Sequence, residues 1–224
     1  AVTAHGADLG IAVDPDVDRL ALVSNRGIPL GEEYTLGLAT DFVLSHTPGE
    51  VAVNASTSLV IDDIAARYGS RVHRTPVGEI HVATKARTTG AVIAGEGNGG
   101  VIYPALHLGR DAIVGIALVL QSLAEKEKSL AELQSDLPQY VMVKDKIALP
   151  FDADAKAMVA RLIQKHAGDK VDLTDGLKFL YDHAWVHIRA SNTEPIIRVI
   201  AEARSEEEAR RRVDALKQEF ASLQ

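Results

Sequence analysis

The sequence contains no cysteine, and aromatic residues make up only 4% of its 224 residues. Without cysteine it can form no disulfide, thiolate nucleophile, or cysteine-ligated zinc or iron–sulfur centre. It also lacks an uninterrupted apolar run of the ~18–20 residues that a membrane helix needs, because its most apolar stretch, residues 112–120, ends at Gln121. We therefore expect neither a disulfide-stapled scaffold nor a membrane partner.

Basic residues are outnumbered: 24 lysines and arginines against 31 aspartates and glutamates give a formal net charge of −7. This balance disfavours general binding to nucleic acid. Hydrophobic residues at 46% and charged residues at 25% are typical of a folded globular protein. The lack of cysteine and of a visible signal sequence favours the cytoplasm. The sequence starts at Ala1 instead of methionine, which fits either a removed initiator or a piece of a longer chain.

The first two thirds of the chain alternate short apolar strands with helical patterns. This alternation is typical of α/β layers built on a parallel sheet. The expected strands cover residues 9–13, 20–23, 51–53, 71–75 and 91–94, and the expected helices cover residues 32–45, 59–68, 79–88 and 111–126.

The last third groups its strands instead. Strands are expected at residues 140–149, 177–181, 185–189 and 196–203, with helices at residues 154–166 and from Ser205 onward. Ser205 followed three residues later by Glu208 is a capping-box signature. Grouped strands with two helices predict a small α+β domain, beginning after a boundary near residues 136–138.

An acidic loop is the sharpest feature of the sequence. It directly follows an apolar strand and consists of Asp14-Pro15-Asp16-Val17-Asp18-Arg19. Residues i, i+2 and i+4 of an extended segment share one face, and adjacent carboxylates repel one another unless a cation neutralises them. Oxygen ligands without histidine or cysteine suit Mg²⁺. Two alternatives stay open: a solvated acidic turn, and an aspartyl phosphatase with Asp16 or Asp14 as its nucleophile.

A glycine-rich loop follows the strand expected at residues 91–94. Its sequence is Gly95-Glu96-Gly97-Asn98-Gly99-Gly100. It formally matches GxGxxG, but no helix follows at once, as the dinucleotide fingerprint requires. Hydrogen bonds between sugar hydroxyls and the side chains of Glu96 and Asn98 are the better use of these residues, and a flexible turn is the alternative.

A polar loop lies between the last two expected strands. It consists of Arg189-Ala190-Ser191-Asn192-Thr193-Glu194-Pro195, with Arg198 beyond it. Hydroxyl, amide and guanidinium groups of this kind can hold a phosphate. An ordinary hairpin turn is equally compatible with the residues alone.

Together and in this order, the three loops resemble those of the α-D-phosphohexomutase superfamily, which includes phosphoglucomutase/phosphomannomutase and phosphoglucosamine mutase. Residues 14–19 are similar to its magnesium loop, DPDGDR, with Val17 in place of glycine. Residues 95–100 are similar to its sugar-recognition loop, GEMSGH, and residues 189–195 to its phosphate loop, RxSNTEP. Residues 75–78 match a further family loop, TPVG, so the resemblance covers essentially the whole chain.

The family has four domains, with its catalytic phosphoserine in the first. The resemblance therefore implies that this chain is a C-terminal portion lacking that serine. Residues 1–30 would end the second domain and carry the metal loop. Residues 31–137 would form the α/β third domain with the sugar loop, and residues 138–224 the α+β fourth domain with the phosphate loop. The missing N-terminal domains of the parent chain would then be its partner.

The resemblance also implies a role for individual residues. Asp14, Asp16 and Asp18 would hold Mg²⁺, and Arg19 would act at the reacting phosphate. The implied substrate-binding residues are Glu79, Glu96, Asn98, Arg189, Ser191, Asn192, Thr193 and Arg198. Glu79 follows the TPVG segment where many members have histidine, and we expect this departure to mark a subfamily.

The implied activity is that of a phosphohexose mutase. The phosphoserine donates to a free hydroxyl of the hexose phosphate, a hexose 1,6-bisphosphate reorients, and its other phosphate returns to serine, while Mg²⁺ offsets charge at the transferring group. Glucosamine phosphate is the favoured substrate, with mannose or glucose phosphate close behind. Without the phosphoserine, we expect no turnover by this chain alone. A sugar-phosphate binding module is the non-enzymatic alternative.

Overall fold

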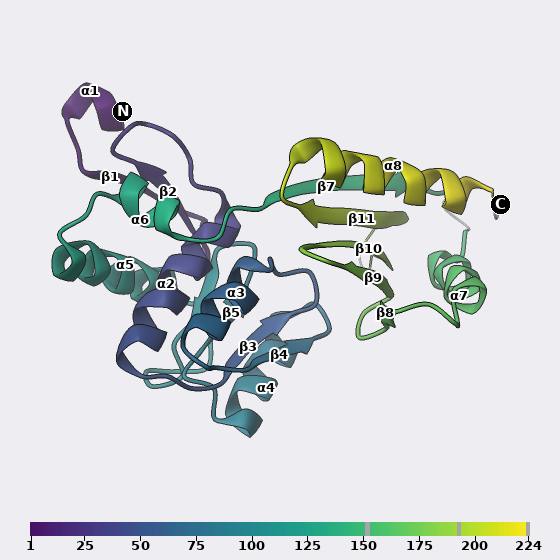
Figure 1. The fold of residues 1–224 in the computed structure, drawn as a ribbon, viewed down its shortest axis with the longest axis horizontal. Helices are drawn as coiled ribbons and strands as arrows, with labels where there is room; N and C mark the ends of the chain where they lie inside the picture. Colours follow the sequence, from purple (N-terminus) through teal and green to yellow (C-terminus); the bar gives the residue numbers. More distant parts are fainter. Residues whose placement is uncertain (151–152, 192–193, 223–224) are drawn as a thin grey trace. The chain divides into compact units, whose positions relative to one another are not determined.

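The structure is a computed structural model and describes residues 1–150, 153–191 and 194–222. The chain forms two compact units, residues 1–139 and residues 140–224, and each is described by itself (Figure 1). The finer division of the first unit into residues 1–30 and 31–137 stays a prediction. Among the described residues, no helix combines the length and the apolar character that crossing a membrane requires.

Unit 1 combines a β-hairpin, a four-stranded sheet and helices. In chain order its elements are α1 (Val2–His5), β1 (Leu9–Val13), β2 (Leu20–Ser24), α2 (Glu32–His46), β3 (Val51–Asn54), α3 (Val60–Arg67), β4 (Val72–Thr75), α4 (Glu79–Thr89), β5 (Ile93–Glu96), β6 (Gly100–Ile102), α5 (Ala112–Lys126) and α6 (Leu130–Asp136).

The sheet of unit 1 has the order β4-β3-β5-β6. Strand β3 is parallel to β4 and β5, and β6 turns back antiparallel to β5. Ala52 and Ala94 form a buried cluster with residues of α4, so their neighbours Val51 and Ile93 face the other side, where α2 contacts β5. Both faces of the sheet are therefore covered, as is usual for parallel strands. In sheets of this kind, ligands bind at the edge where the parallel strands have their carboxyl ends.

The β1–β2 hairpin carries the acidic loop at its tip. Its two strands pair antiparallel from Leu9 opposite Ser24 to Val13 opposite Leu20. Leu20 and Leu22 bury β2 in the core of unit 1, with 1% and 2% of their surfaces exposed. The backbone N–H of Leu20 donates to the Gly99 carbonyl at 3.1 Å. This bond ties the hairpin tip to the glycine-rich loop.

Unit 2 is built on an antiparallel sheet of order β7-β11-β10-β9-β8. Helix α8 packs against β7, β11 and β10, and α7 packs against β10 and β9. Together they bury one apolar core. Its elements are β7 (Val141–Ala148), α7 (Ala155–Lys165), β8 (Val171–Asp172), β9 (Leu177–Tyr181), β10 (Ala184–Ala190), β11 (Ile196–Ala203) and α8 (Glu206–Ala221).

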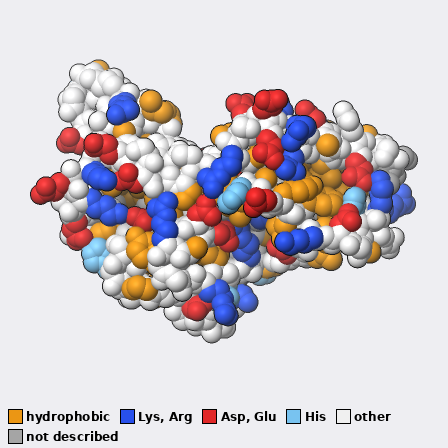
Figure 2. Space-filling model, viewed as in Figure 1, with side chains coloured by type: hydrophobic (Ala, Val, Ile, Leu, Met, Phe, Trp, Pro, Cys, Tyr) orange, Lys and Arg blue, Asp and Glu red, His pale blue; other side chains and the backbone are white. Residues whose placement is uncertain are grey.

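The sequence of α8 explains why this segment forms a helix. Val213, Leu216 and Phe220 bury its inner face, as the 4-3-4 spacing predicts. Its first turn is acidic, which suits the positive end of the helix dipole, and acidic and basic side chains mix on its outer surface (Figure 2). The Ser205 hydroxyl accepts a hydrogen bond from the Glu208 N–H at 3.2 Å, which is one half of the predicted capping box.

The predicted class is confirmed: an α/β unit with parallel strands precedes a smaller α+β unit. The predicted strands and helices are all present, with ends displaced by a few residues. Four short elements of the structure were not predicted from the sequence, and these are α1, α6, β6 and β8. The miss at α6 was avoidable, because Ser129 and Glu132 form a complete capping box at its start.

Candidate functional site

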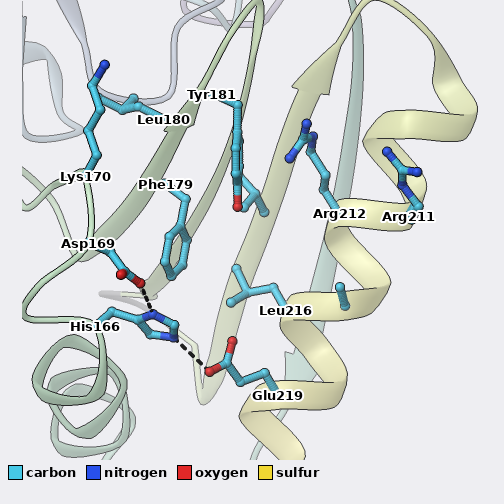
Figure 3. A pocket seen from close by; sticks show the side chains of 12 residues that line it. His166, Asp169, Lys170, Phe179, Leu180, Tyr181, Arg211, Arg212, Leu216 and Glu219 are labelled. Carbon is cyan, nitrogen blue, oxygen red and sulfur yellow. Dashed lines mark hydrogen bonds and ion pairs between the residues drawn. The ribbon is translucent and has the colours of Figure 1, made fainter.

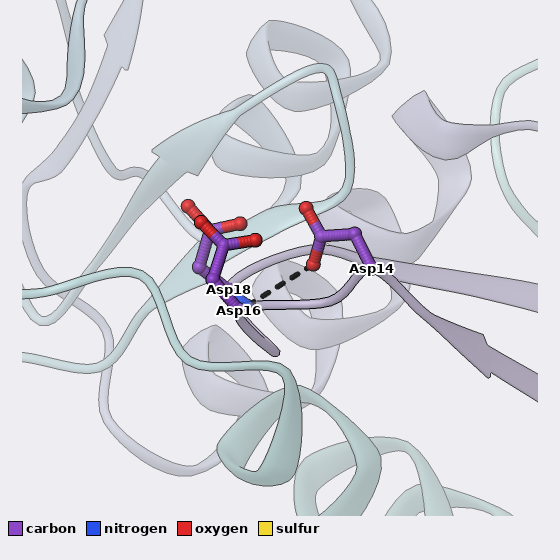
Figure 4. Close-up of side chains that lie close together, drawn as sticks. All are labelled: Asp14, Asp16 and Asp18. Atoms are coloured by element: carbon purple, nitrogen blue, oxygen red, sulfur yellow. Dashed lines mark hydrogen bonds between the residues drawn. The ribbon is translucent and has the colours of Figure 1, made fainter.

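The three aspartates of the acidic loop converge. A carboxylate oxygen of each of Asp14, Asp16 and Asp18 lies within 4.8 Å of the others, and Figure 4 shows the side chains gathered at the loop. The cause differs from the extended segment that the alternation suggested. The Val17 N–H donates to the Asp14 carbonyl at 3.0 Å, so the loop turns at this point and brings the carboxylates together.

Val17 adopts the left-handed conformation, with φ of 58°. Such a conformation is strained for a β-branched residue and natural for glycine, the residue that the resembling loop has at this position. The Val17 carbonyl accepts a hydrogen bond at 3.1 Å from the N–H of Ala112, the first residue of α5. The helix therefore helps to hold the turn in place.

Asp14 organises the loop from within. One of its oxygens accepts from the N–H groups of Asp18 and Arg19 at 3.2 and 3.0 Å, and the other from Arg19 Nε at 2.7 Å. Burial would raise the pKa of Asp14, but the hydrogen bonds from Arg19 and Asp18 outweigh it and lower the pKa to about 2. For Asp18, burial and the neighbouring Asp14 raise the pKa, while the charge of Arg110 opposes them.

Arg110 connects the acidic loop to two other segments, a role that no motif in the sequence indicated. Its Nη2 donates to Asp18 and its Nη1 to Glu96, the latter at 2.7 Å. Its Nε lies 3.4 Å from a Glu79 carboxylate oxygen, and its backbone N–H donates to the other Glu79 oxygen at 2.8 Å. Only 16% of the Arg110 side chain is exposed. The only feature of the sequence that could have pointed to Arg110 is its position directly before Asp111, the N-cap of α5.

Glu96 lies at the carboxyl end of β5 and is 3% exposed. One of its oxygens accepts from Asn54 Nδ2 at 2.8 Å and from the Gly78 N–H at 3.2 Å, while the other accepts from Arg110. Asn54 ends β3, and Gly78 immediately precedes α4. The carboxyl edge of the sheet therefore assembles around this carboxylate.

The glycine-rich loop is tightly packed. A Cβ at Gly97 would overlap the carboxylate of Glu33, and Gly99 has φ of 88° with the Leu20 carbonyl beside it. Gly99 needs glycine for space and for conformation, because backbone atoms of Leu20 would meet its Cβ, whereas a Cβ at Gly97 would require only the end of the Glu33 side chain to shift. Asn98, which is less buried than Glu96, accepts a hydrogen bond from the Gly100 N–H at 3.2 Å. The loop is thus an ordered turn.

In unit 2, Arg189 and Arg198 stand directly opposite each other on β10 and β11. Lys146 on β7 is the register partner of Arg198, so three cationic residues form a row across neighbouring strands. Arg198 pairs with Glu194 at 3.0 Å, and Arg189 Nε lies 3.9 Å from Asp175. Like charges in register repel, so an anion at this row would relieve the repulsion.

The polar loop is described only in part. The Ser191 N–H donates to the Ile196 carbonyl at 3.0 Å, which closes the hairpin between β10 and β11. Asn192 and Thr193 lie outside the described residues.

His187 precedes Arg189 on the same face of β10. Burial lowers its pKa to about 4, helped by the charges of Lys178 and Arg189. His187 is therefore neutral at pH 7 and adds no charge to the row.

A separate pocket in unit 2 is lined by residues of α8, β9 and the segment after α7 (Figure 3). His166 lies at its edge, with its Nε2 2.8 Å from Glu219 and its Nδ1 hydrogen-bonded to Asp169. None of the residues singled out from the sequence lines this pocket. It therefore plays no part in the site assembled here.

The donor set of the acidic loop fits a hard divalent cation. It supplies three carboxylates and no nitrogen or sulfur ligand. Asp18 Oδ1 is buried and has no hydrogen-bond partner among the described residues, although Arg19 Nε lies 3.5 Å from it. A buried oxygen left without a donor is costly, and a cation would satisfy it.

Two family models match adjoining parts of the chain. Residues 31–141 match "Phosphoglucomutase/phosphomannomutase, alpha/beta/alpha domain III", and residues 140–219 match "Phosphoglucomutase/phosphomannomutase, C-terminal domain". The family models thus define the class of the chain as phosphohexomutase-type. It belongs to the phosphoglucomutase/phosphomannomutase family of the α-D-phosphohexomutase superfamily and corresponds to its C-terminal portion.

Two curated relatives illustrate the similarity. A phosphoglucomutase/phosphomannomutase of Thermococcus kodakarensis is 42% identical over 93% of this chain and 46% of its own length. A protein of Methanopyrus kandleri named probable phosphoglucosamine mutase is 38% identical over 99% of this chain and 49% of its own. The chain thus spans about half the length of these relatives.

Solved structures agree on the fold. A phosphoglucomutase/phosphomannomutase family protein of Burkholderia thailandensis superposes with a TM-score of 0.82 at 25% identity, over 99% of this chain and 48% of that one. An Aspergillus fumigatus N-acetylphosphoglucosamine mutase, solved with GlcNAc-6P and magnesium, gives a TM-score of 0.64 at 18% identity over 95% of this chain and 48% of that one. At this lower identity the likeness concerns the fold alone.

Proposed function

We propose that this chain supplies the metal, sugar and phosphate sites of a phosphohexose mutase. The observation that carries the proposal is the convergence of Asp14, Asp16 and Asp18 beside Arg110, which joins their loop to the sugar loop at Glu96. Family membership supports the same assignment.

The acidic loop is the proposed Mg²⁺ site, held by Asp14, Asp16 and Asp18. When bound, the ion would offset negative charge on a transferring phosphoryl group. Arg19 is the proposed catalytic residue of this chain. Its side chain is 49% exposed while Asp14 holds its Nε, so the rest of its guanidinium can still donate to a phosphate oxygen.

The sugar would be held by Glu79, Glu96 and Asn98. One oxygen of Glu96 accepts from Asn54 and Gly78, and among the described residues the other accepts from Arg110 alone, so the second oxygen keeps a lone pair to which a sugar hydroxyl can donate. Glu79 is the more accessible carboxylate, with 39% of its side chain exposed. Its bonds to Arg110 give a physical reason for an acid at this position, where the family resemblance leads us to expect histidine.

The phosphate that does not react would be held by Arg189, Ser191 and Arg198. The cationic row on β10, β11 and β7 supports this assignment. Asn192 and Thr193 are proposed to assist from the same loop. The phosphate site would thus bind the substrate in both of its orientations, so that a hexose 1,6-bisphosphate can reorient between the two transfers.

Glucosamine phosphate is the proposed substrate, and several relatives named probable phosphoglucosamine mutase support it. The Thermococcus kodakarensis relative favours glucose or mannose phosphate instead. The proposed partner is the remainder of the parent chain with its phosphoserine, and the proposed compartment is the cytoplasm. An aspartyl phosphatase with Asp14 or Asp16 as nucleophile is the weaker candidate. Hydrogen bonds to both oxygens of Asp14 make that carboxylate a poorer nucleophile, which favours Asp16 of the two.

Calorimetric titration with Mg²⁺ tests the metal site. We expect saturable binding to the wild-type chain and its loss in Asp16→Ala, because one of three carboxylate ligands is removed. Asp182→Asn is the matched control, since the Asp182 side chain is 97% exposed and lies in unit 2. Equal binding by the wild type and Asp16→Ala would sink the assignment.

A further inference from the structure

One guanidinium is shared by the two loops of the unit 1 site. Arg110 donates through Nη2 to Asp18 in the acidic loop and through Nη1 to Glu96 at the start of the glycine-rich loop. Asp18 and Arg110 are 92 residues apart in the sequence, so only the fold brings the loops to a common group. A second link, from the Leu20 N–H to the Gly99 carbonyl, runs beside it.

The chain of contacts continues beyond Glu96. The second oxygen of Glu96 accepts from the N–H of Gly78, the residue before α4. A guanidinium is planar, and its donors have fixed directions. A displacement of Asp18 therefore changes which donors Arg110 can offer to Glu96, and Glu96 in turn positions the Gly78 N–H.

The charges around Arg110 indicate how a bound cation would shift its contacts. Arg110 faces three carboxylates, those of Asp18, Glu79 and Glu96. A divalent cation held by the acidic loop adds positive charge next to Arg110 and competes with it for Asp18. The guanidinium is then drawn toward Glu96 and Glu79, the two carboxylates that the cation does not bind.

We infer that Arg110 is a positioning residue that transmits occupation of the acidic loop by a divalent cation to the sugar loop and the start of α4. Cation binding loosens the Asp18–Arg110 pair and strengthens the bonds of Arg110 to Glu96 and Glu79. The glycine-rich loop and the Gly78 amide become more ordered as a result. The inference rests on the proposed metal site and goes beyond it, because it couples that site to sugar binding.

Amide hydrogen exchange with Mg²⁺ alone as the probe tests this coupling in the 224-residue chain. The reporter amides of the acidic loop are Asp18 and Arg19, which donate to Asp14. The distant reporter is Gly78. We expect Mg²⁺ to slow exchange at all three by at least about threefold in the wild type. In Arg110→Met, the slowing persists at Asp18 and Arg19 and disappears at Gly78.

Two further variants complete the design. Arg110→Lys keeps the positive charge but lacks the two diverging N–H donors of the guanidinium fork. We expect it, like Arg110→Met, to abolish the effect of Mg²⁺ on exchange at Gly78. It also serves where Arg110→Met fails to fold. Arg87→Met changes an exposed arginine of α4 and is expected to respond as the wild type does.

The outcomes separate two kinds of failure. If the Gly78 amide responds to Mg²⁺ equally in the wild type and in Arg110→Met, or is silent in the wild type while Asp18 and Arg19 respond, Arg110 does not couple the loops. Full recovery of the Gly78 response in Arg110→Lys would overturn the role of the guanidinium fork. If Mg²⁺ leaves the exchange rates of the Asp18 and Arg19 amides unchanged in the wild type, the proposed metal site is wrong. The proposed coupling is then wrong as well, because it depends on that site.

Discussion

The two candidate binding regions of this chain differ in how their charges are arranged. In unit 1, carboxylates surround a largely buried guanidinium, that of Arg110, and opposite charges interlock. In unit 2, Arg189 and Arg198 face each other in register, and Lys146 extends the row. Unlike charges hold the first region together without a ligand, whereas like charges make the second favour an anion.

The contrast has consequences for stability. Residues of the unit 1 region, above all Glu96, are part of the fold as well as of the site. The Arg198–Glu194 pair of unit 2 is 41% and 52% exposed, and such exposed pairs contribute little. Changes to the first region should therefore affect folding, and changes to the second should affect mainly binding.

The largest effect is expected for Glu96→Ala. It removes the most buried of the three carboxylates that face Arg110, and it removes the acceptor of Asn54 and Gly78. Removing one member of a buried ion pair costs about 3–5 kcal/mol, so unit 1 should lose stability on this scale. Urea unfolding, followed by amide exchange of residues in unit 1, measures the loss.

Glu194→Ala is the matched change in unit 2. It removes the exposed partner of Arg198 and should cost no more than ~1 kcal/mol. Fluorescence of the single tryptophan, Trp185, reports on unit 2. Equal losses in the two variants would contradict the contrast between a structural and a surface charge cluster.

A smaller effect, on binding alone, is expected for Arg189→Ala. Loss of a hydrogen bond to a charged group should weaken hexose phosphate binding by ~1.5–3 kcal/mol. Binding of the neutral hexose should change far less. Calorimetry with glucose 6-phosphate and with glucose measures both. If the two ligands lost affinity equally, Arg189 would be a structural residue instead of a phosphate ligand.

Much of the fold could be predicted because its signals are local. Residues 51–53 and 91–94 show the apolar runs of buried strands, and Val213 and Leu216 follow helical spacing. Strand β6 escaped notice because it has only three residues and begins with a glycine. Short elements of this kind are fixed by pairing with a neighbour, which a local pattern does not reveal.

The candidate site was predictable only where it follows motifs. Asp14, Asp16 and Asp18 stood out by their alternation, yet they converge through a turn at Val17 that a β-branched residue rarely adopts. Arg110 has no motif, and its role depends on contacts with Asp18 and Glu96 that only the fold creates. Arg110 also contacts Glu79 and so connects that residue to Asp18 and Glu96.

The central claim is that this chain binds metal, sugar and phosphate but carries no group that transfers phosphate in the mutase reaction. Isomer formation by the purified chain tests it most directly, with Mg²⁺, hexose phosphate and hexose 1,6-bisphosphate present and mass spectrometry to detect covalent phosphate. We predict no turnover and no phosphorylated residue, and recovery of turnover when an N-terminal half bearing the phosphoserine is supplied. Robust turnover by the chain alone, or phosphate bound covalently to Asp16 or any other of its residues, would contradict the account.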